Sequence, residues 1–160
     1  MSIGLLHFGE PVVGAVVDPI RKEVFRASQG NGAWLGDQRI FVSECQQLDE
    51  ALVAASFSAR VPRQSPEIER FIEMLHRCQA LRRMGSAALN LCNVARGGLD
   101  GYWATSVKMW DIAAGVAIVN EAGGIVTHIN GGSLDVENPQ FVASSNDVLH
   151  AQMLDGLAIK

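Results

Sequence analysis

Cysteine is scarce in this sequence, and its placement excludes two kinds of small protein. The three cysteines are odd in number, far apart and without a C-x-x-C pair: Cys45, Cys78 and Cys92. This is neither a disulfide framework nor a zinc cluster, and the four histidines also lack the spacing of zinc ligands. We interpret the cysteines as reduced thiols of a cytoplasmic protein.

Long apolar runs and excess basic charge are also missing. No apolar run reaches the roughly 20 residues needed to cross a bilayer, and residues 3–17 are interrupted by glycine, proline and Glu10. Without a basic region or a cleavage site there, we predict no signal peptide and no membrane partner. The net charge of −4 argues against nucleic acid as the main partner, and an anionic substrate would need a cation or a local positive site.

The residues that are present suit one globular domain over residues 1–160. Hydrophobic residues make up 48% of the chain, which is enough for a substantial core. No internal repeat, low-complexity segment or flexible linker divides the sequence.

Turn residues and apolar runs in the first 42 residues predict an antiparallel meander. A tight turn of positive φ is expected at Gly30-Asn31-Gly32. Because the apolar residues of the first two strands are nearly continuous, we expect both strands to be covered on both faces. The expected strands are residues 3–8, 12–17, 23–28, 33–35 and 39–42.

Strands and helices alternate after residue 50. Helices are expected to begin at 65–67, 85–88, 111 and 146–147, between strands at 52–57, 80–84, 100–104, 125–129 and 141–144. The expected buried face of the first helix consists of Ile68, Phe71, Ile72 and Leu75. The fold class is therefore mixed α/β, an antiparallel meander followed by a mixed sheet that is covered by helices.

Two of these helix starts are candidate sites. Asp111 precedes a run of small and apolar residues, where an acidic side chain either caps free N–H groups or ligates a metal beside them. Gly85-Ser86 either caps the second helix or brings its backbone close to a ligand. If the two helix starts converge at strand ends, they form a pocket for an anionic ligand.

Six segments in register resemble the inositol monophosphatase family. Trp110-Asp111-Ile112-Ala113-Ala114-Gly115 is similar to the family's carboxy-terminal signature. The order and spacing of the six segments match the family over nearly all 160 residues. The other five segments are Gly14–Pro19, Gly30–Gly36, Gly85–Cys92, Gly97–Tyr102 and Asn120–Gly124.

The resemblance implies a fold, a reaction and a set of site residues. The fold is the carboxy-terminal part of a layered αβαβα architecture, and the reaction is Mg²⁺-dependent hydrolysis of inositol or related small sugar phosphates. Asp111 is implied as a metal ligand in contact with substrate, and Gly85, Ser86 and Ala87 as walls that meet the hydroxyl-bearing ring. Capping and ligation by Asp111 are compatible.

Two departures from the family pattern limit these implications. The main metal motif, Asp-Pro-hydrophobic-Asp-Gly-Thr, is absent; Asp18-Pro19-Ile20 imitates its opening, but the cationic pair Arg21-Lys22 follows and would repel Mg²⁺. Ala104 stands where the family commonly has a glutamate that accepts a hydrogen bond from a substrate hydroxyl. The resemblance therefore does not imply which polyol phosphate is bound.

With Asp111 as its only strong ligand, the chain alone is expected to be inactive, its amino-terminal metal-binding part being absent. The alternative is a non-catalytic binding or assembly module that retains the fold without the metal centre. In either case the meander should expose Leu5, Phe8, Val13 and Val16, which predicts a homodimer or higher oligomer.

Overall fold

The computed structural model describes residues 1–158, which form two five-stranded sheets and four α-helices. The first sheet is antiparallel with its strands in chain order, as the meander predicts. Its turn at Gly30-Asn31-Gly32 has the predicted positive φ at both glycines. The strands are β1 (Ser2–His7), β2 (Glu10–Asp18), β3 (Glu23–Ser28), β4 (Ala33–Leu35) and β5 (Gln38–Ile40).

The second sheet is mixed, in the order β7-β6-β8-β10-β9. β6 runs parallel to both β7 and β8, whereas β10 is antiparallel to β8 and β9. The carboxyl ends of β6, β7 and β8 therefore lie at one edge of the sheet. The strands are β6 (Leu52–Ser56), β7 (Ala80–Arg82), β8 (Gly101–Ala104), β9 (Ile125–His128) and β10 (Phe141–Ser144).

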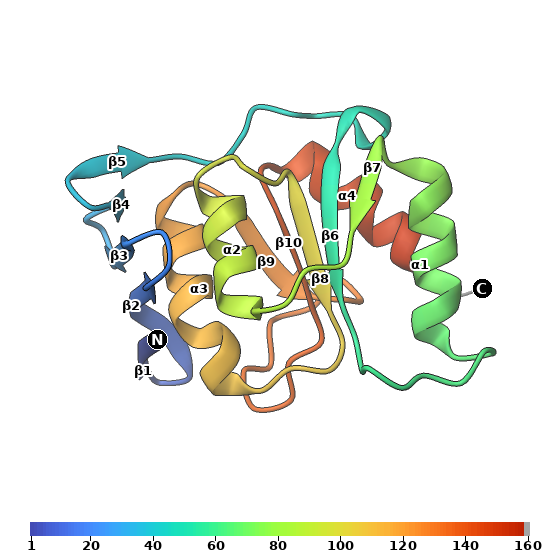
Figure 1. Cartoon of the computed structure of the whole chain (residues 1–160), viewed down its shortest axis with the longest axis horizontal. Coiled ribbons are helices and arrows are strands. Elements are labelled where there is room, and N and C mark those ends of the chain that lie inside the picture. The colour runs from blue at the N-terminus through green and yellow to red at the C-terminus, as the bar shows by residue number, and fades with distance from the viewer. Residues whose placement is uncertain (159–160) are drawn as a thin grey trace.

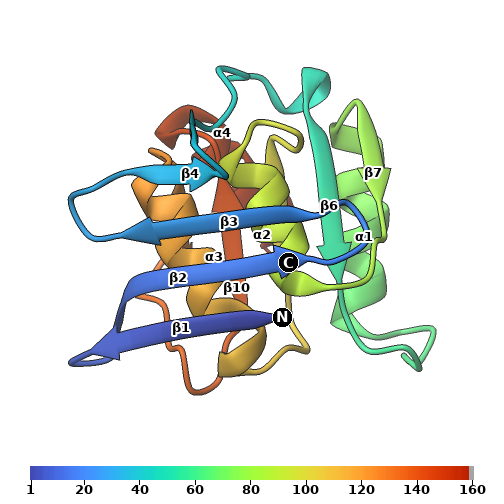
Figure 2. The same cartoon turned by 60° about the vertical axis from the view of Figure 1, so that its left-hand side comes forward.

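The helices form two layers. α2 and α3 lie between the sheets, and α1 and α4 cover the far face of the second sheet (Figure 1). When the molecule is turned so that the first sheet comes forward, β1 to β4 lie across α2 and α3 (Figure 2). This confirms the predicted mixed α/β class. No helix within residues 1–158 is long and apolar enough to span a bilayer. The helices are α1 (Pro66–Arg77), α2 (Ala87–Ala95), α3 (Met109–Glu121) and α4 (Asp147–Leu157), with a 3₁₀ turn, η1 (Leu48–Glu50).

Small residues allow α3 to pack closely on both of its sides. Gly4 and Gly14 pair across β1 and β2, and a Cβ atom on Gly14 would overlap the backbone carbonyl of Ala114. On another face of α3, a Cβ atom on Gly115 would lie 2.6 Å from the Leu91 side chain of α2. The run of alanine and glycine after Asp111 therefore fixes α3, and with it Asp111, between a sheet and a helix.

The outer face of β1 and β2 is exposed, so the prediction that both faces of the first two strands are covered is wrong. Val13 of β2 is 39% exposed. Ile3 is 62% exposed and Leu5 is 59% exposed, because no described layer covers the outer face of the first sheet. Phe8, in the β1–β2 turn, is also exposed, as predicted. Val16 faces inward and is buried, which corrects its predicted exposure.

The buried face of α1 is narrower than its sequence suggests. Ile72 and Leu75 are about half exposed, whereas Met74 is fully buried in the core between the second sheet and the outer helices. Phe71 packs partly against that core. Ser65 occupies the N-cap position as predicted, but its hydroxyl makes no capping hydrogen bond. The helix thus turns a stripe that includes Met74 toward the core, where α1 packs against α4 and β7.

The end of α3 is fastened to the β3–β4 turn by Glu121. Its carboxylate accepts hydrogen bonds from the backbone N–H of Gly30 at 2.8 Å and of Gly32 at 2.7 Å. A carboxylate is unfavourable beside the negative end of a helix dipole, and the hydrogen bonds from these two N–H groups offset that cost.

Replacing Glu121 with alanine should lower the free energy of unfolding by about 2 kcal/mol, because two N–H groups lose a charged acceptor. Glu121→Gln keeps one acceptor oxygen and should lose about half as much. Urea denaturation of the three proteins measures both effects. Equal stability of the alanine variant and the parent chain would show that the turn does not need this fastening.

His150 is a buried histidine that joins α4 to β9 and β10. Its Nδ1 lies 2.7 Å from the Ser144 hydroxyl, and its Nε2 lies 2.9 Å from the Thr127 hydroxyl. Burial lowers the pKa of His150 below its ordinary value of 6.5, an effect that the nearby charge of Asp147 opposes.

Stability should therefore fall as the pH falls below the ordinary histidine value. The unfolded chain takes up a proton at His150 near pH 6.5, whereas the folded chain resists it until lower pH. Urea denaturation at a series of pH values on either side of this value should show the decline, and His150→Gln should show a smaller one. An identical decline in the variant would assign the pH dependence to other groups.

Candidate functional site

The starts of α2 and α3 converge at the carboxyl edge of the second sheet. α2 follows β7 and α3 follows β8, and both strands run parallel to β6, so both helix starts are delivered to one edge. Ser86, Ala87 and Asp111 line a single cavity of about 240 Å³ there. The cavity is also lined by the first sheet, through Ser2 and Val17, and by Pro19 in the turn after β2.

Gly85 lies in a neighbouring cavity and not in the one that Asp111 lines. That cavity, of about 360 Å³, is formed by the end of β6, the residue after it and the segment that follows β7. A Cβ atom on Gly85 would meet nothing within 4 Å, so the backbone there is open to a ligand. The segment Gly85-Ser86-Ala87 thus separates two cavities, and the structure divides the three predicted wall residues between them.

Ser86 caps α2 from a strained backbone conformation. Its φ is 52°, in the left-handed region that favours glycine, and its hydroxyl oxygen accepts a hydrogen bond from the N–H of Leu89 at 3.4 Å. Residues held in this region persist where the surrounding structure fixes them, and they cluster at functional sites. The first residues of α2, Ala87 and Ala88, also line the cavity, so the positive end of the helix dipole acts there.

Asp111 is the third residue of α3, and the N-cap position is occupied by Lys108. One carboxylate oxygen, Oδ2, accepts a hydrogen bond from the backbone N–H of Lys108 at 2.9 Å. The helix therefore begins at Met109, two residues before the predicted start. The Asp111 side chain still caps it, through the hydrogen bond to the N-cap residue Lys108. Within residues 1–158, Oδ1 has no hydrogen-bond or ion-pair partner, which leaves it able to bind a cation at the cavity wall.

The donors around the cavity supply only part of a metal site. Mg²⁺ prefers six oxygen ligands, of which carboxylates are the strongest. Among the residues that the structure describes, no group of three histidine, cysteine or acidic side chains lies close enough to hold a metal ion. Asp111 fits as one carboxylate ligand of Mg²⁺, and the rest of a complete set would have to come from elsewhere.

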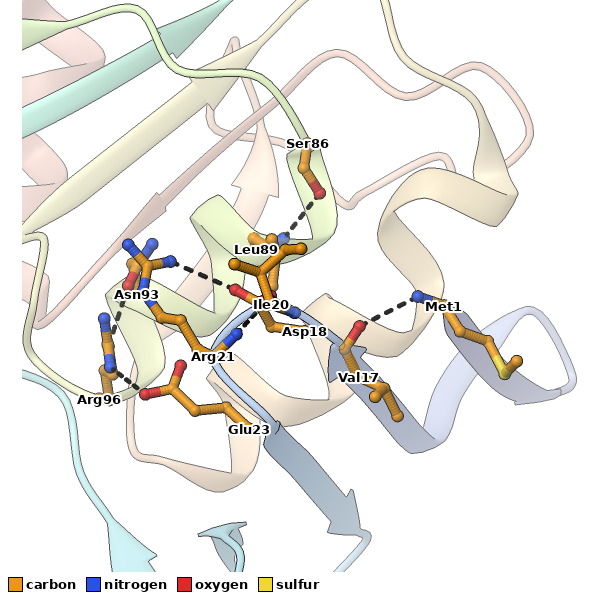
Figure 3. A network of polar contacts seen from close by, with 10 residues as sticks. All are labelled: Met1, Val17, Asp18, Ile20, Arg21, Glu23, Ser86, Leu89, Asn93 and Arg96. Atoms are coloured by element: carbon orange, nitrogen blue, oxygen red, sulfur yellow. Dashed lines mark hydrogen bonds and ion pairs between the residues drawn. The ribbon is translucent and has the colours of Figure 1, made fainter.

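Asp18 uses its carboxylate to build the turn after β2. Oδ1 accepts hydrogen bonds from the N–H groups of Ile20 and Arg21 at 2.9 and 3.2 Å, and Oδ2 pairs with the Arg21 guanidinium at 3.2 Å. The backbone N–H of Arg21 is the largest cause that lowers the pKa of this carboxyl group. Figure 3 shows this turn against α2, where Arg96 joins Glu23 and Asn93. The carboxylate is thus occupied within its own turn.

Ala104 lies at the end of β8 and is fully buried between Ser56 of β6 and Phe141 of β10. A glutamate at this position would need its neighbours to move before it could reach either cavity. Arg83 is a cavity residue that the sequence analysis missed. The only signal for it was the pair Arg82-Arg83 just before Gly85 in a chain of net negative charge.

Fold and cavity together define a layered α/β protein with two helix starts and one carboxylate at the edge of a sheet. The sequence profile of the inositol monophosphatase family matches residues 1–158. The chain therefore belongs to the inositol monophosphatase family.

Relatives of known sequence resemble nearly the whole chain. It is 41% identical over 159 residues to an inositol-1-monophosphatase of Synechocystis sp., covering 99% of this chain and 55% of the relative. It is 41% identical over 146 residues to the Nus factor SuhB of Pasteurella multocida, covering 91% of this chain and 55% of that protein. The chain thus spans about half the length of the curated relatives that it matches.

Solved structures agree with this assignment. An inositol monophosphatase from Anabaena has a TM-score of 0.91 at 37% identity, over 98% of this chain and 62% of the other. The structure of SaIMPase-II with inositol monophosphate bound has a TM-score of 0.83 at 27% identity, over 96% of this chain and 59% of the other.

Proposed function

We propose that residues 1–160 are the carboxy-terminal part of a Mg²⁺-dependent phosphatase that hydrolyses inositol or related small sugar phosphate monoesters. The observation that carries this proposal is the cavity in which Asp111 lies beside the start of α2. Membership of the family supports it, as does the relative that is described with inositol monophosphate bound. In this role Asp111 is a metal ligand, and Gly85, Ser86 and Ala87 are substrate-binding residues.

Different residues of the cavity would bind the cation, the phosphate and the polyol. Mg²⁺, when bound, would supply positive charge against the phosphate. Asp111 would hold that cation through Oδ1, while Oδ2 keeps its hydrogen bond to Lys108 and fixes the carboxylate. The first turn of α2 would attract the phosphate through its dipole, and Ser86 offers a hydroxyl to the polyol.

We further propose a cytoplasmic protein. Its support is the state of the cysteines, of which none forms a disulfide within the described residues. Burial raises the pKa of the Cys92 thiol to about 12, and it also raises the pKa values of Cys45 and Cys78. Such thiols are poor nucleophiles and remain reduced in a reducing compartment.

The test of the proposed function is phosphate release. The 160-residue chain should be inactive, because one carboxylate does not hold the two or three Mg²⁺ ions that this chemistry needs. Extending it at its amino terminus with the corresponding segment of a relative should give Mg²⁺-dependent hydrolysis of inositol and sugar monophosphates. Turnover by the short chain would show that its catalytic centre is complete, and no turnover by a folded extended protein would contradict the phosphatase assignment.

A non-catalytic binding or assembly module is the second candidate function. It is favoured by the relatives that are named Nus factor SuhB, which occur in several bacteria. Under this function the extended protein would keep the fold and bind a partner without releasing phosphate. The phosphate-release assay therefore separates the two candidates.

We also propose that the chain forms a homodimer or a higher oligomer through β1. Ile3, Leu5 and Val13 form an exposed apolar face beside a strand edge with unpaired backbone groups. Light scattering should give at least twice the monomer mass, and Leu5→Lys should give the monomer. Ile72→Lys, on the exposed side of α1, is the matched control and should leave the mass unchanged. A monomeric parent chain at high concentration would refute this interface.

A further inference from the structure

A further cavity, of about 200 Å³, lies at the carboxyl end of α3, the end of the helix away from Asp111. Its lining comes from three parts of the fold: the start of β2, the second half of α3, and β9 with the segment that follows it. These parts are distant in sequence and only the tertiary fold brings them together. The phosphatase chemistry proposed above uses none of them.

Most of the lining of this cavity is apolar. Val116 is 1% exposed and Val136 is 7% exposed, so these two side chains form its buried part. Pro11, Val126 and Leu134 complete the apolar surface. An apolar cavity of about 150 Å³ holds benzene, which has six heavy atoms. The volume here therefore suits an alkyl chain of about five carbon atoms, whereas a sugar would lose the hydration of its hydroxyl groups.

Three polar side chains line the same cavity, and all three belong to exposed residues: Glu10, Asn120 and Ser133. Within residues 1–158, none of these side chains makes a hydrogen bond or an ion pair. Each offers an oxygen that accepts hydrogen bonds, and a primary ammonium group has three N–H donors and no acceptor. The acceptors of the cavity therefore match the donors of a primary ammonium ion in number.

The charge at this cavity is negative. Among the described residues that line it, Glu10 alone is ionised at neutral pH. Asn120 lies in the last turn of α3, where the negative end of the helix dipole attracts cations. Both features would repel an anion. The carboxyl end of α3 thus favours a cationic ligand, whereas the start of α2 favours an anionic one.

We propose that this cavity binds a small primary alkylammonium ion. The ammonium group donates hydrogen bonds to Glu10, Asn120 and Ser133 on the solvent side, and the alkyl chain packs against Val116 and Val136. Because these polar residues are exposed, the ammonium group keeps part of its hydration and the cost of burying its charge is small. The burial of the alkyl chain supplies most of the binding free energy. This site does not depend on the phosphatase assignment.

Titration of the 160-residue chain with pentylammonium, followed by amide NMR shifts, tests this site. We expect shifts at Val116 and Val136, and tighter binding than that of 1-pentanol or pentanoate, which have the same chain length without the positive charge. Glu10→Gln should weaken pentylammonium binding about fivefold, the upper end for an exposed ion pair, and leave 1-pentanol binding unchanged. Glu44→Gln removes an exposed carboxylate that does not line the cavity, so this matched control should bind both probes as the parent chain does.

Several outcomes would overturn the proposal. Equal affinity of the parent chain for pentylammonium and 1-pentanol would show that the ammonium group is not recognised, as would equal losses in Glu10→Gln and Glu44→Gln. Shifts confined to other parts of the chain would remove the ligand from this cavity. A tripeptide with a central lysine carries the same ammonium group on a bulkier body and should bind more weakly. Tighter binding of the tripeptide would assign the cavity to a protein partner and not to a small molecule.

Discussion

Replacing Asp111 with asparagine in the amino-terminally extended enzyme should lower kcat for phosphate release by about 100-fold or more. Asparagine has nearly the same shape, and its carbonyl oxygen can still accept the hydrogen bond from Lys108 that begins α3. The helix and the fold should therefore survive. What the substitution removes is the negative charge that would hold Mg²⁺ against the phosphate, so the loss should appear in catalysis and not in stability.

Steady-state kinetics at several Mg²⁺ concentrations, with urea denaturation of the same proteins, measures this separation. Asp147→Asn is the matched control, because Asp147 also lies in the first turn of a helix, α4, and lines neither cavity. It should keep full activity. Undiminished phosphate release by Asp111→Asn would remove the metal role assigned to this carboxylate.

Replacing Gly14 with alanine should destabilise the chain by about 3 kcal/mol, near the upper end for an overpacked core. The new Cβ atom would overlap the backbone carbonyl of Ala114, and a backbone group cannot rotate away as a flexible side chain can. Either β2 or α3 has to move. Because Asp111 lies in the first turn of α3, the same substitution should also disturb the cavity.

Urea denaturation again measures the loss, with Gly85→Ala as the control. A Cβ atom on Gly85 meets nothing within 4 Å, and its φ lies outside the left-handed region, so its stability should change by less than about 0.5 kcal/mol. A Gly14→Ala chain as stable as the parent would show that α3 tolerates displacement from the first sheet.

Local signals in the sequence predicted where strands and helices occur. They did not predict which faces of those elements are buried by other parts of the fold. The turn at Gly30-Asn31-Gly32 requires glycine conformations, so the meander could be read directly. The coverage of β1 could not, because an apolar run does not reveal whether another layer lies over it. Likewise, periodicity placed an apolar stripe on α1, but the tertiary packing against α4 and the second sheet buries Met74 and leaves Leu75 about half exposed.

In the candidate site too, residues with a local sequence signal could be predicted, whereas residues that only tertiary packing brings to the cavity could not. Ser86 and Asp111 could be named because each stands at a recognisable helix start, and Ala87 because the family resemblance implies it. Parallel strands bring both helix starts to one edge. The wall formed by Val17 and Pro19 could not, since it depends on how the first sheet crosses α3. Arg83 was missed because a charged residue in a connecting segment carries no periodic signal.

The close packing of α3 fixes the position of the helix, and it therefore fixes the distance from Asp111 to the other residues that line the cavity. A Cβ atom added at Gly14 would clash with the backbone of Ala114, and one added at Gly115 would clash with Leu91 of α2. Either substitution should therefore shift α3, and Asp111 with it. A displacement of about 1 Å in such a group can cost 100-fold in rate. Random mutagenesis should therefore recover folded, inactive enzymes whose substitutions touch neither metal nor substrate.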